Sequence, residues 1–308
     1  MPDVTELDVT TPDGRTVHAY DRAPRAGATE GEPLVVVWHH GTPNVGAPPA
    51  PLFEAADRLG IRWVSYDRPG YGGSTPHPDR AVATAAQDVA AVVDALGVER
   101  FAVMGHSGGG PHALACAALL PDRVRGAVVG GCLAPYGADG LDWFAGMIPS
   151  GVAALRAAAA GRAAKEAYEA SGAEYDPQFT TADLDALHHE WSWFDAVVGP
   201  AVANGPAPST DDDLAYVRPW GFDPADVAAP TLVLHGTQDG IVPSAHGEWL
   251  ARRVPSAELW LDPGAGHISV LRRGDAALGR LVERLGAPSR GERVGSGAAS
   301  REDRPTAR

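Results

Sequence analysis

Short apolar runs alternate with segments of helical periodicity along most of the chain. Leu34–Trp38 is continuously apolar and rich in β-branched residues, which is typical of a strand buried on both faces. Thr5–Thr10 and Arg15–Asp21 flank the turn Pro12-Asp13-Gly14 and predict an antiparallel pair. Further strands are expected at Ile61–Tyr66, Phe101–Met104, Val124–Val129, Thr231–His235 and Glu258–Leu261. Helices are expected between them, at Pro51–Leu59, Ala81–Leu96, Pro111–Leu120, Ser244–Arg252 and Ser269–Leu285. The alternation predicts an α/β protein with a mostly parallel, doubly wound sheet.

The alternation is interrupted between residues 134 and 222. This segment shows no strand pattern, and its helical stretches are separated by Gly and Pro. We expect helices at Val152–Ala170, Thr181–Val198 and Asp211–Arg218. The sequence therefore predicts one core of residues 1–133 and 223–287, a helical cap of residues 134–222, and a disordered tail of residues 288–308, which has almost nothing to bury.

Composition and charge exclude several classes of protein. The chain has 308 residues, 44% of them apolar, and a net charge of −14 with a single lysine, Lys165. So acidic a chain is ill suited to bind nucleic acid or an anionic membrane. Cys116 and Cys132 lie in apolar surroundings and are expected to be buried thiols. Because the first residues resemble no targeting segment, a cytoplasmic location is expected. The sequence makes no prediction of oligomeric state.

The strongest local signal surrounds Ser107. The sequence Gly105-His106-Ser107-Gly108-Gly109 comes directly after a predicted strand and directly before a predicted helix. A serine at such a sharp turn has a strained backbone, and glycines beside it avoid collisions with the neighbouring strand and helix. The turn presents the hydroxyl outward, so we interpret Ser107 as a nucleophile. The alternative is a glycine-rich connection without chemistry.

A serine nucleophile needs a base, and the base needs an orienting acid. Asp239 and His267 each follow a predicted strand, and ligands gather at the carboxyl ends of strands in open α/β sheets. The order Ser107, Asp239, His267 fits nucleophile, acid and base. Taken singly, Asp239 could instead form a turn, and His267 could cap the last helix.

Stabilisation of an oxyanion requires two backbone N–H donors. Gly108 follows the serine at a helix N-terminus, and its amide is one candidate. Thr42, in His39-His40-Gly41-Thr42-Pro43, is the other, since Pro43 has no N–H to donate. The alternative for this second segment is an ordinary loop.

These motifs together resemble those of α/β-hydrolase-fold serine hydrolases over about residues 5–285. The resemblance also rests on the turn Asp67-Arg68-Pro69-Gly70-Tyr71-Gly72-Gly73-Ser74. It implies a Ser107–His267–Asp239 triad and a cap, residues 134–222, over the pocket. The family includes esterases, lactonases, iminopeptidases, carbon–carbon hydrolases and perhydrolases. In the family's dehalogenases and epoxide hydrolases an aspartate occupies the strand-to-helix turn, called the nucleophile elbow. In this chain the elbow is Gly105–Gly109, and it carries Ser107.

Several other features are given a structural role. His188-His189-Glu190 lacks a third ligand at suitable spacing, so we expect no metal, and no cofactor. Asp211-Asp212-Asp213 is interpreted as N-capping and dipole-complementing charge at a helix start. We expect packing or hydrogen-bonding roles for His106, His112 and His235.

The cap is rich in tryptophan. Most of its aromatic residues are expected to pack, and some to line a pocket for a small, mainly apolar substrate. The candidates for substrate binding are Trp143, Trp191, Trp193 and Trp220. The sequence thus favours hydrolysis of a carboxylic ester or related acyl bond through an acyl-enzyme. The alternatives are a carbon–carbon bond or lactone hydrolase with the same triad, and a non-catalytic small-molecule receptor.

Overall fold

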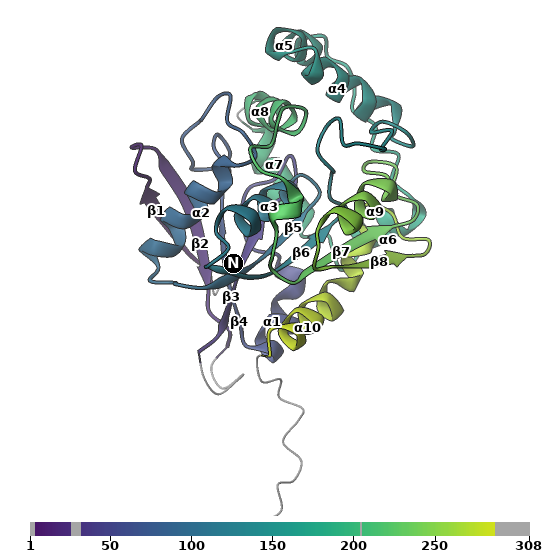
Figure 1. Cartoon of the computed structure of the whole chain (residues 1–308). Coiled ribbons are helices and arrows are strands. Elements are labelled where there is room, and N and C mark those ends of the chain that lie inside the picture. The colour runs from purple at the N-terminus through teal and green to yellow at the C-terminus, as the bar shows by residue number, and fades with distance from the viewer. Residues whose placement is uncertain (1–3, 26–31, 204, 287–308) are drawn as a thin grey trace, which may run out of the picture.

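The computed structural model describes residues 4–25, 32–203 and 205–286, and the predicted tail at 288–308 lies outside them. In this described part eight strands form one sheet, in the order β1-β2-β4-β3-β5-β6-β7-β8 (Figure 1). Strands β1 and β2 pair antiparallel, as do β2 and β4, and all other neighbours are parallel. The predicted mostly parallel α/β class is confirmed. The strands are β1 (Thr5–Thr10), β2 (Thr16–Arg22), β3 (Leu34–His39), β4 (Ile61–Tyr66), β5 (Phe101–His106), β6 (Val124–Gly130), β7 (Thr231–Gly236) and β8 (Ala257–Asp262).

Helices cover both faces of the sheet. Along β3, Val36 and Trp38 belong to one buried cluster and Val35 and Val37 to another, because successive side chains of a strand point to opposite faces. The first cluster takes in α1 and α10, which lie side by side in Figure 1, and the second takes in α2, α3 and α9. A strand buried on both faces has a continuous apolar run, here Leu34–Trp38, as the sequence indicated. The helices are α1 (Phe53–Leu59, after the 3₁₀ turn Ala50–Leu52), α2 (Thr84–Ala95), α3 (Gly109–Leu119), α9 (Ser244–Arg253) and α10 (Gly274–Arg284, after the 3₁₀ turn Ser269–Arg273).

The segment between β6 and β7 is helical, but two of its three predicted helices are each divided in two. The stretch expected as one helix at Val152–Ala170 is broken at Gly161, whose φ of 110° is open to glycine alone. The stretch expected at Thr181–Val198 also forms two helices. Five helices therefore lie in the described part of this segment. They are α4 (Pro149–Ala159), α5 (Arg162–Ala170), α6 (Thr181–His188), α7 (Phe194–Val202) and α8 (Ala207–Tyr216).

These five helices fall into two groups. Helices α4, α5 and α8 contact one another and lie at the top of the molecule in Figure 1. Helix α6 contacts the 3₁₀ turn Ser269–Arg273, and α7 contributes Phe194 and Val197 to the cluster on one face of the sheet. Only the first group therefore stands clear of the sheet, and the second is part of the core packing.

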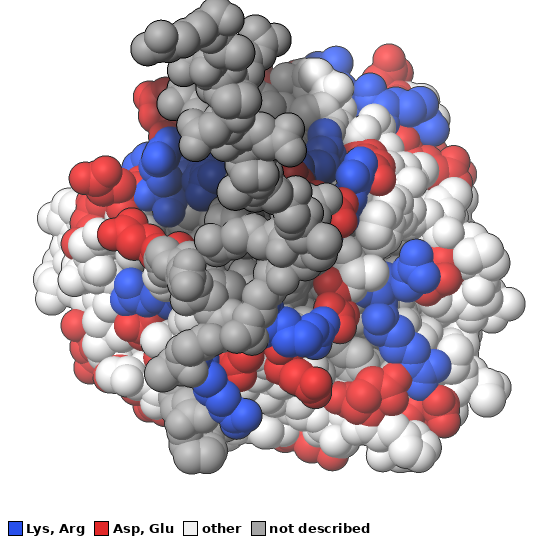
Figure 2. Space-filling model, turned by 90° about the horizontal axis from the view of Figure 1, so that it is seen from below, with Lys and Arg blue, Asp and Glu red and all other residues white. Residues whose placement is uncertain are grey.

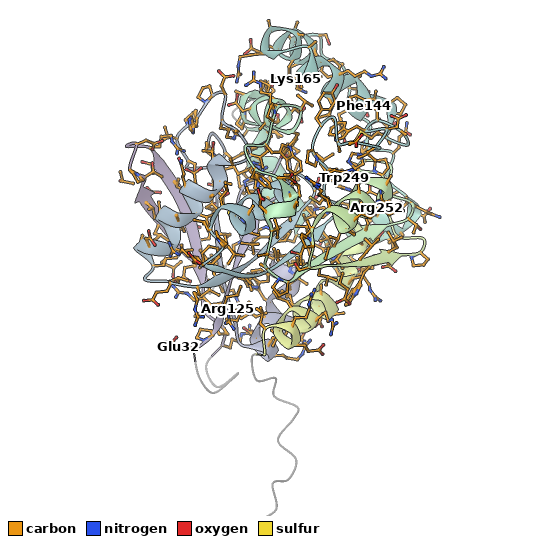
Figure 3. All side chains as sticks on the ribbon, viewed as in Figure 1. Glu32, Arg125, Phe144, Lys165, Trp249 and Arg252 are labelled. Atoms are coloured by element: carbon orange, nitrogen blue, oxygen red, sulfur yellow. The ribbon has the colours of Figure 1, made fainter. Side chains whose placement is uncertain are left out.

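A cavity of about 740 Å³ lies where the helical segment joins the sheet domain. Its lining includes Pro135 and Asp139 near one end of the segment, Phe222 at the other, and Trp249 and Arg252 of α9. Figure 3 shows Trp249 and Arg252 below Phe144, a cap residue. The two connections of the cap therefore run past a common hollow.

Charges of both signs are interspersed on the face seen from below in Figure 2. The one lysine is buried in the upper helices, where Figure 3 labels it: Lys165 Nζ lies 2.6 Å from both Glu169 Oε1 and Asp213 Oδ2. Cys116 and Cys132 are free, buried thiols, as predicted. Within the described residues, none of the helices combines the length and the apolar character needed to cross a bilayer.

Candidate active site

Ser107 occupies a tight turn between β5 and α3. Its φ is 54°, in the left-handed region that a serine adopts only when its surroundings impose it. Its amide donates to Gly130 O at 2.8 Å. A β-carbon on Gly105 would lie 2.4 Å from Gly109 O, and one on Gly109 would lie 2.0 Å from His39 O. The two glycines are required because helix and strand come this close, as the sequence suggested.

Asp239 and His267 meet at the carboxyl end of the sheet. His267 Nδ1 lies 2.7 Å from Asp239 Oδ2, and both side chains are buried. Asp239 Oδ1 accepts from the amides of Ile241 and Val242, at 2.9 and 2.8 Å. These bonds leave the carboxylate fixed against one edge of the imidazole, which is the arrangement that sets the tautomer of a histidine base.

Electrostatics favour the charged forms of this pair. Burial lowers the pKa of His267, but the charge and hydrogen bond of Asp239 outweigh it, and the net pKa is raised. Burial likewise raises the pKa of Asp239, and the nearby His267 reverses the sign and lowers it. Asp239 is therefore an anion at neutral pH.

The elbow and the His267 loop are in contact through His106. The rings of His106 and His267 have centroids 4.9 Å apart, and His106 Nε2 lies 2.9 Å from His267 O. Since a carbonyl can only accept, this nitrogen of His106 carries the hydrogen. The residue that precedes Ser107 is thereby in direct contact with the His267 loop.

The three flanking histidines have the roles expected of them. His106 donates to His267 O, His112 Nδ1 to Gly108 O at 2.8 Å, and His235 Nε2 to Val242 O at 2.7 Å. Burial lowers the pKa of His106 and His112 to about 3, and it also lowers the pKa of His235. All three are neutral hydrogen-bonding groups.

Thr42 lies beside the elbow. A β-carbon placed on Gly41 would be 3.6 Å from Ser107 Cβ, which brings the two loops into contact. The Thr42 hydroxyl donates to Asp212 Oδ2 at 2.6 Å and lies 2.8 Å from the Tyr216 hydroxyl. Thr42 is therefore hydrogen-bonded to helix α8, in the helical segment that was predicted to be a cap.

Gly108 leaves a space that hydroxyl groups fill. A β-carbon there would lie 2.2 Å from Tyr216 Oη and 2.6 Å from Thr42 Oγ1. The Tyr216 hydroxyl also lies 3.1 Å from Gly108 O, as a donor. Because Gly108 has no side chain, a cap residue reaches the residue that follows Ser107.

Asp212 joins α8 to the sheet domain through two buried arginines. Its Oδ2 accepts from Arg68 at 2.6 Å and from the Tyr71 hydroxyl at 2.9 Å, and its Oδ1 accepts from Arg80 at 2.7 Å. Arg68 also donates to Thr42 Oγ1 at 2.9 Å. Although burial opposes ionisation, the two guanidinium groups hold the pKa of Asp212 well below its usual range.

This network overturns the interpretation of Asp211–Asp213 as helix-start charge. Helix α8 begins at Ala207, so these residues lie in its middle, and Asp212 is fully buried. Three adjacent carboxylates resemble a solvated run in the sequence because their partners are distant along the chain. Arg68 lies in the Asp67–Ser74 turn, for which the sequence predicts no role, and Tyr216 carries no local signal.

The four cap tryptophans occupy two different places. Trp191 and Trp193 belong to the cluster of Trp38 on one face of the sheet, and Trp193 lies 6.5 Å from Trp38 between ring centroids. Trp143 and Trp220 belong to a separate cluster with Leu214 of α8. Substrate contact by these residues stays a prediction.

No group of three or more His, Cys, Asp or Glu side chains in the described residues could hold a metal ion. His189 of the His188-His189-Glu190 run instead lies with Nδ1 2.8 Å from Asp185 O, within its own helix turn.

Comparison with known proteins decides the family. The model of the α/β hydrolase fold family matches residues 35–273. This chain belongs to that family. Among curated relatives, the non-heme chloroperoxidase of Streptomyces lividans is 32% identical over 77% of this chain and 83% of its own. The 2-hydroxymuconate semialdehyde hydrolase of Pseudomonas putida is 29% identical over 82% and 86%.

Solved structures share the fold of this α/β hydrolase family member. The bromoperoxidase of Bacillus anthracis has a TM-score of 0.69 at 21% identity, covering 91% of this chain and 100% of its own. A thermophilic esterase of Thermogutta terrifontis has a TM-score of 0.64 at 21% identity, covering 91% and 99%. The family match and the curated relatives place the chain among the hydrolases.

Proposed function

We propose that the protein is a serine hydrolase that cleaves a carboxylic ester or related acyl bond of a small, mainly apolar substrate. The observation that carries the proposal is the buried Asp239–His267 pair at 2.7 Å, which His106, the neighbour of Ser107, contacts directly. A buried carboxylate that orients a buried imidazole is the pair of groups that activates a serine nucleophile.

In the proposed reaction His267 removes the proton of Ser107 as the hydroxyl oxygen attacks the acyl carbon. The proton then passes to the leaving alcohol, and the acyl group stays on Ser107. His267 next activates a water that releases the acid and regenerates the serine. Asp239 holds the imidazole in one tautomer and stabilises its cation throughout.

The amides of Thr42 and Gly108 are the proposed oxyanion donors. Both residues are held by hydrogen bonds. The Thr42 hydroxyl bonds to Arg68 and Asp212. The Gly108 carbonyl accepts from His112 and Tyr216. Donors that are already fixed cost no reorganisation during the reaction, and one such donor contributes about 3 kcal/mol of transition-state stabilisation.

The decisive test replaces Ser107 by alanine and follows hydrolysis of p-nitrophenyl acyl esters. We expect kcat to fall by about 10⁴-fold or more, because the covalent route is removed. The matched control is Ser171→Ala, in the turn after α5, which should keep wild-type turnover. Wild-type turnover in Ser107→Ala would refute the mechanism.

A fluorophosphonate probe tests the same site without turnover. Covalent labelling of wild type but not of Ser107→Ala is expected, as found by intact-protein mass spectrometry. Absence of labelling, with thermal stabilisation by small apolar ligands, would instead favour a non-catalytic receptor.

A carbon–carbon or lactone hydrolase is the second candidate. It is favoured by similarity to the 2-hydroxymuconate semialdehyde hydrolase. It is also favoured by similarity to the 2-hydroxy-6-oxononadienedioate/2-hydroxy-6-oxononatrienedioate hydrolase of Cupriavidus pinatubonensis, which is 28% identical over 92% of this chain and 96% of its own. A panel of simple esters, lactones and vinylogous diketones separates the two. Inert simple esters with rapid cleavage of a diketone or lactone would select this candidate.

The cap tryptophans complete the proposal. We place the substrate between the cap and the sheet domain, with Trp143, Trp191, Trp193 and Trp220 as the aromatic residues around it. Replacing each by leucine and comparing KM for short and long acyl chains distinguishes a pocket wall from a packing residue, because only the former changes chain-length preference.

A further inference from the structure

The carboxylate of Asp183 lies on helix α6 of the cap but binds the loop that carries His267. Asp183 Oδ1 accepts from the amides of Ile268 at 2.9 Å and Ser269 at 2.8 Å. Oδ2 accepts from the amide of His267 itself at 3.2 Å. One cap side chain therefore gathers three successive N–H groups of the His267 loop.

The loop is shaped around this carboxylate. Asp183 is 1% exposed, and a β-carbon on Gly266 would lie 2.0 Å from its Oδ2, so only glycine leaves room for it. The Ser269 hydroxyl donates to Oδ1 at 2.8 Å and accepts from the Gly266 amide at 2.8 Å. The sequence Gly266-His267-Ile268-Ser269 thus supplies both the space and the donors.

Capping of its own helix does not account for this arrangement. Asp183 does form a capping box with Thr180, whose amide donates to Oδ2 at 3.2 Å. That is one bond from its own helix start, compared with three amides and a hydroxyl from the His267 loop. Capping of α6 needs none of these four, and they bind Asp183 to the start of the 3₁₀ turn that follows His267.

His267 is consequently held at three points. Its amide donates a hydrogen bond to Asp183, and its carbonyl accepts one from His106 at 2.9 Å. Its ring Nδ1 lies 2.7 Å from Asp239. A movement of Asp183 would shift the backbone of His267, and the ring with it.

The charges that face His267 come from Asp239 and Asp183. His106 and His235 also face it, but burial keeps both neutral, the pKa of His106 being lowered to about 3. Despite burial, the donors of Ser269 and Ile268 lower the pKa of Asp183, which is therefore an anion. Burial lowers the pKa of His267, but the negative charges of Asp239 and, to a smaller extent, Asp183 outweigh it, so the net pKa is raised.

We infer that Asp183 is a positioning residue, through which the cap fixes the place and the charge environment of the base His267. The inference rests on the proposed function for its catalytic meaning. It makes the cap part of the support of the catalytic base, in addition to any contact with substrate.

The test replaces Asp183 by asparagine in the full chain. An Asn NH₂ would face N–H donors, so the loop loses bonds, and kcat for p-nitrophenyl esters is expected to fall by about 10- to 100-fold with KM little changed. The acid limb of the pH–rate profile should move to lower pH, because a negative charge near His267 is removed. A merely structural role would leave that limb in place.

The matched control is Asp185→Asn on the same helix. Asp185 is exposed and paired with Arg272 at 2.5 Å, so the change removes one negative charge from the same helix and leaves the hydrogen bonds of Asp183 intact. Wild-type kcat and acid limb are expected. If Asp183→Asn matched Asp185→Asn in both, the inference would be overturned.

Titration of His267 by NMR makes the result independent of turnover. The imidazole resonance, assigned by its loss in His267→Gln, should titrate at lower pH in Asp183→Asn than in wild type. That shift supports the inference even if esters are not hydrolysed, whereas an unchanged midpoint overturns it even if they are.

A milder variant covers the case in which Asp183→Asn does not fold. Ser269→Ala removes one hydroxyl donor to Asp183 Oδ1 and keeps the charge. A lower kcat with an unmoved His267 midpoint is then expected. Wild-type kcat in Ser269→Ala would overturn the inference.

Discussion

The candidate site has two sides, and a buried aspartate of the cap supports each by different means. On the base side, comprising Asp239, His267 and its loop, Asp183 accepts from backbone amides and one hydroxyl. On what we propose as the oxyanion side, comprising Thr42 and Gly108, Asp212 accepts from two guanidinium groups and two hydroxyls. Both carboxylates are anions, but only the second has full positive charges as partners.

The difference sets what each support costs to remove. Loss of an anion held by neutral donors leaves unsatisfied N–H groups, at about 1–3 kcal/mol. Loss of an anion from a buried ion network leaves uncompensated charges, at about 3–5 kcal/mol. The Asp212 network on the oxyanion side therefore contributes more to the free energy of unfolding. On the base side, a change of charge at Asp183 changes the pKa of His267.

The largest expected effect follows from Asp212→Asn. The substitution keeps the shape but leaves Arg68 and Arg80, both nearly fully buried, without their shared anion. We expect a loss of about 3–5 kcal/mol in the free energy of unfolding, measured by urea titration.

An exposed ion pair provides the control for that measurement. Asp223 pairs with Arg253 at the surface, with both side chains about half exposed, and Asp223→Asn should cost under about 1 kcal/mol. If Asp212→Asn were no more damaging than Asp223→Asn or Asp183→Asn, the contrast between the two sides would be wrong.

A smaller effect is expected from Tyr216→Phe. The hydroxyl lies 2.8 Å from Thr42 Oγ1 and 3.1 Å from Gly108 O, so its loss loosens both oxyanion residues. One neutral hydrogen bond contributes about 1 kcal/mol, which predicts a fall of about fivefold in kcat. The acid limb should not move, because no charge near His267 changes.

Tyr136→Phe is the matched control, since Tyr136 is exposed and packs by its ring against Trp143. Wild-type kcat is expected there. An acid-limb shift in Tyr216→Phe would show that the two sides are not separable.

The smallest effect concerns wild type and its dependence on pH. The base must be neutral to accept a proton, and the pKa of His267 is raised above its ordinary 6.5. As pH falls through that raised pKa, kcat/KM should decline, with a midpoint above 6.5. Near-UV circular dichroism should stay constant over the same range, because the pKa of Asp212 is well below 3.8. A midpoint below 6.5 would contradict the charge assignment of the base side.

Much of the fold could be predicted because its signals are local. β1 and β4 begin and end at the predicted residues, and the other strands differ by one or two residues at an end, because runs of apolar and β-branched residues mark them in the sequence. The helices of the cap were harder. The break at Gly161 depends on a φ of 110°, and a lone glycine in an alanine-rich stretch does not by itself end a helix.

The site divides in the same way. Asp239 and His267 could be proposed from strand ends, and the structure brings them together. The contacts of Asp212 with Arg68 and of Asp183 with His267 span 144 and 84 residues, and no pattern along the chain indicates them. A carboxylate that pairs with a buried cation has the same local sequence as one that faces water. The sequence-based interpretation of Asp211–Asp213 as helix-start charge is therefore wrong.

The reach of Asp183 and Asp212 into the sheet domain limits how the enzyme could be engineered or recombined. Exchange of residues 134–222 for the cap of another family member would remove both carboxylates in one step. The recipient would keep Arg68, Arg80 and Gly266, which are shaped for partners it no longer has. A transplanted cap would therefore need an acidic residue at the position of Asp183 and another at the position of Asp212. Without them the site would lose its support, whatever pocket the new cap forms.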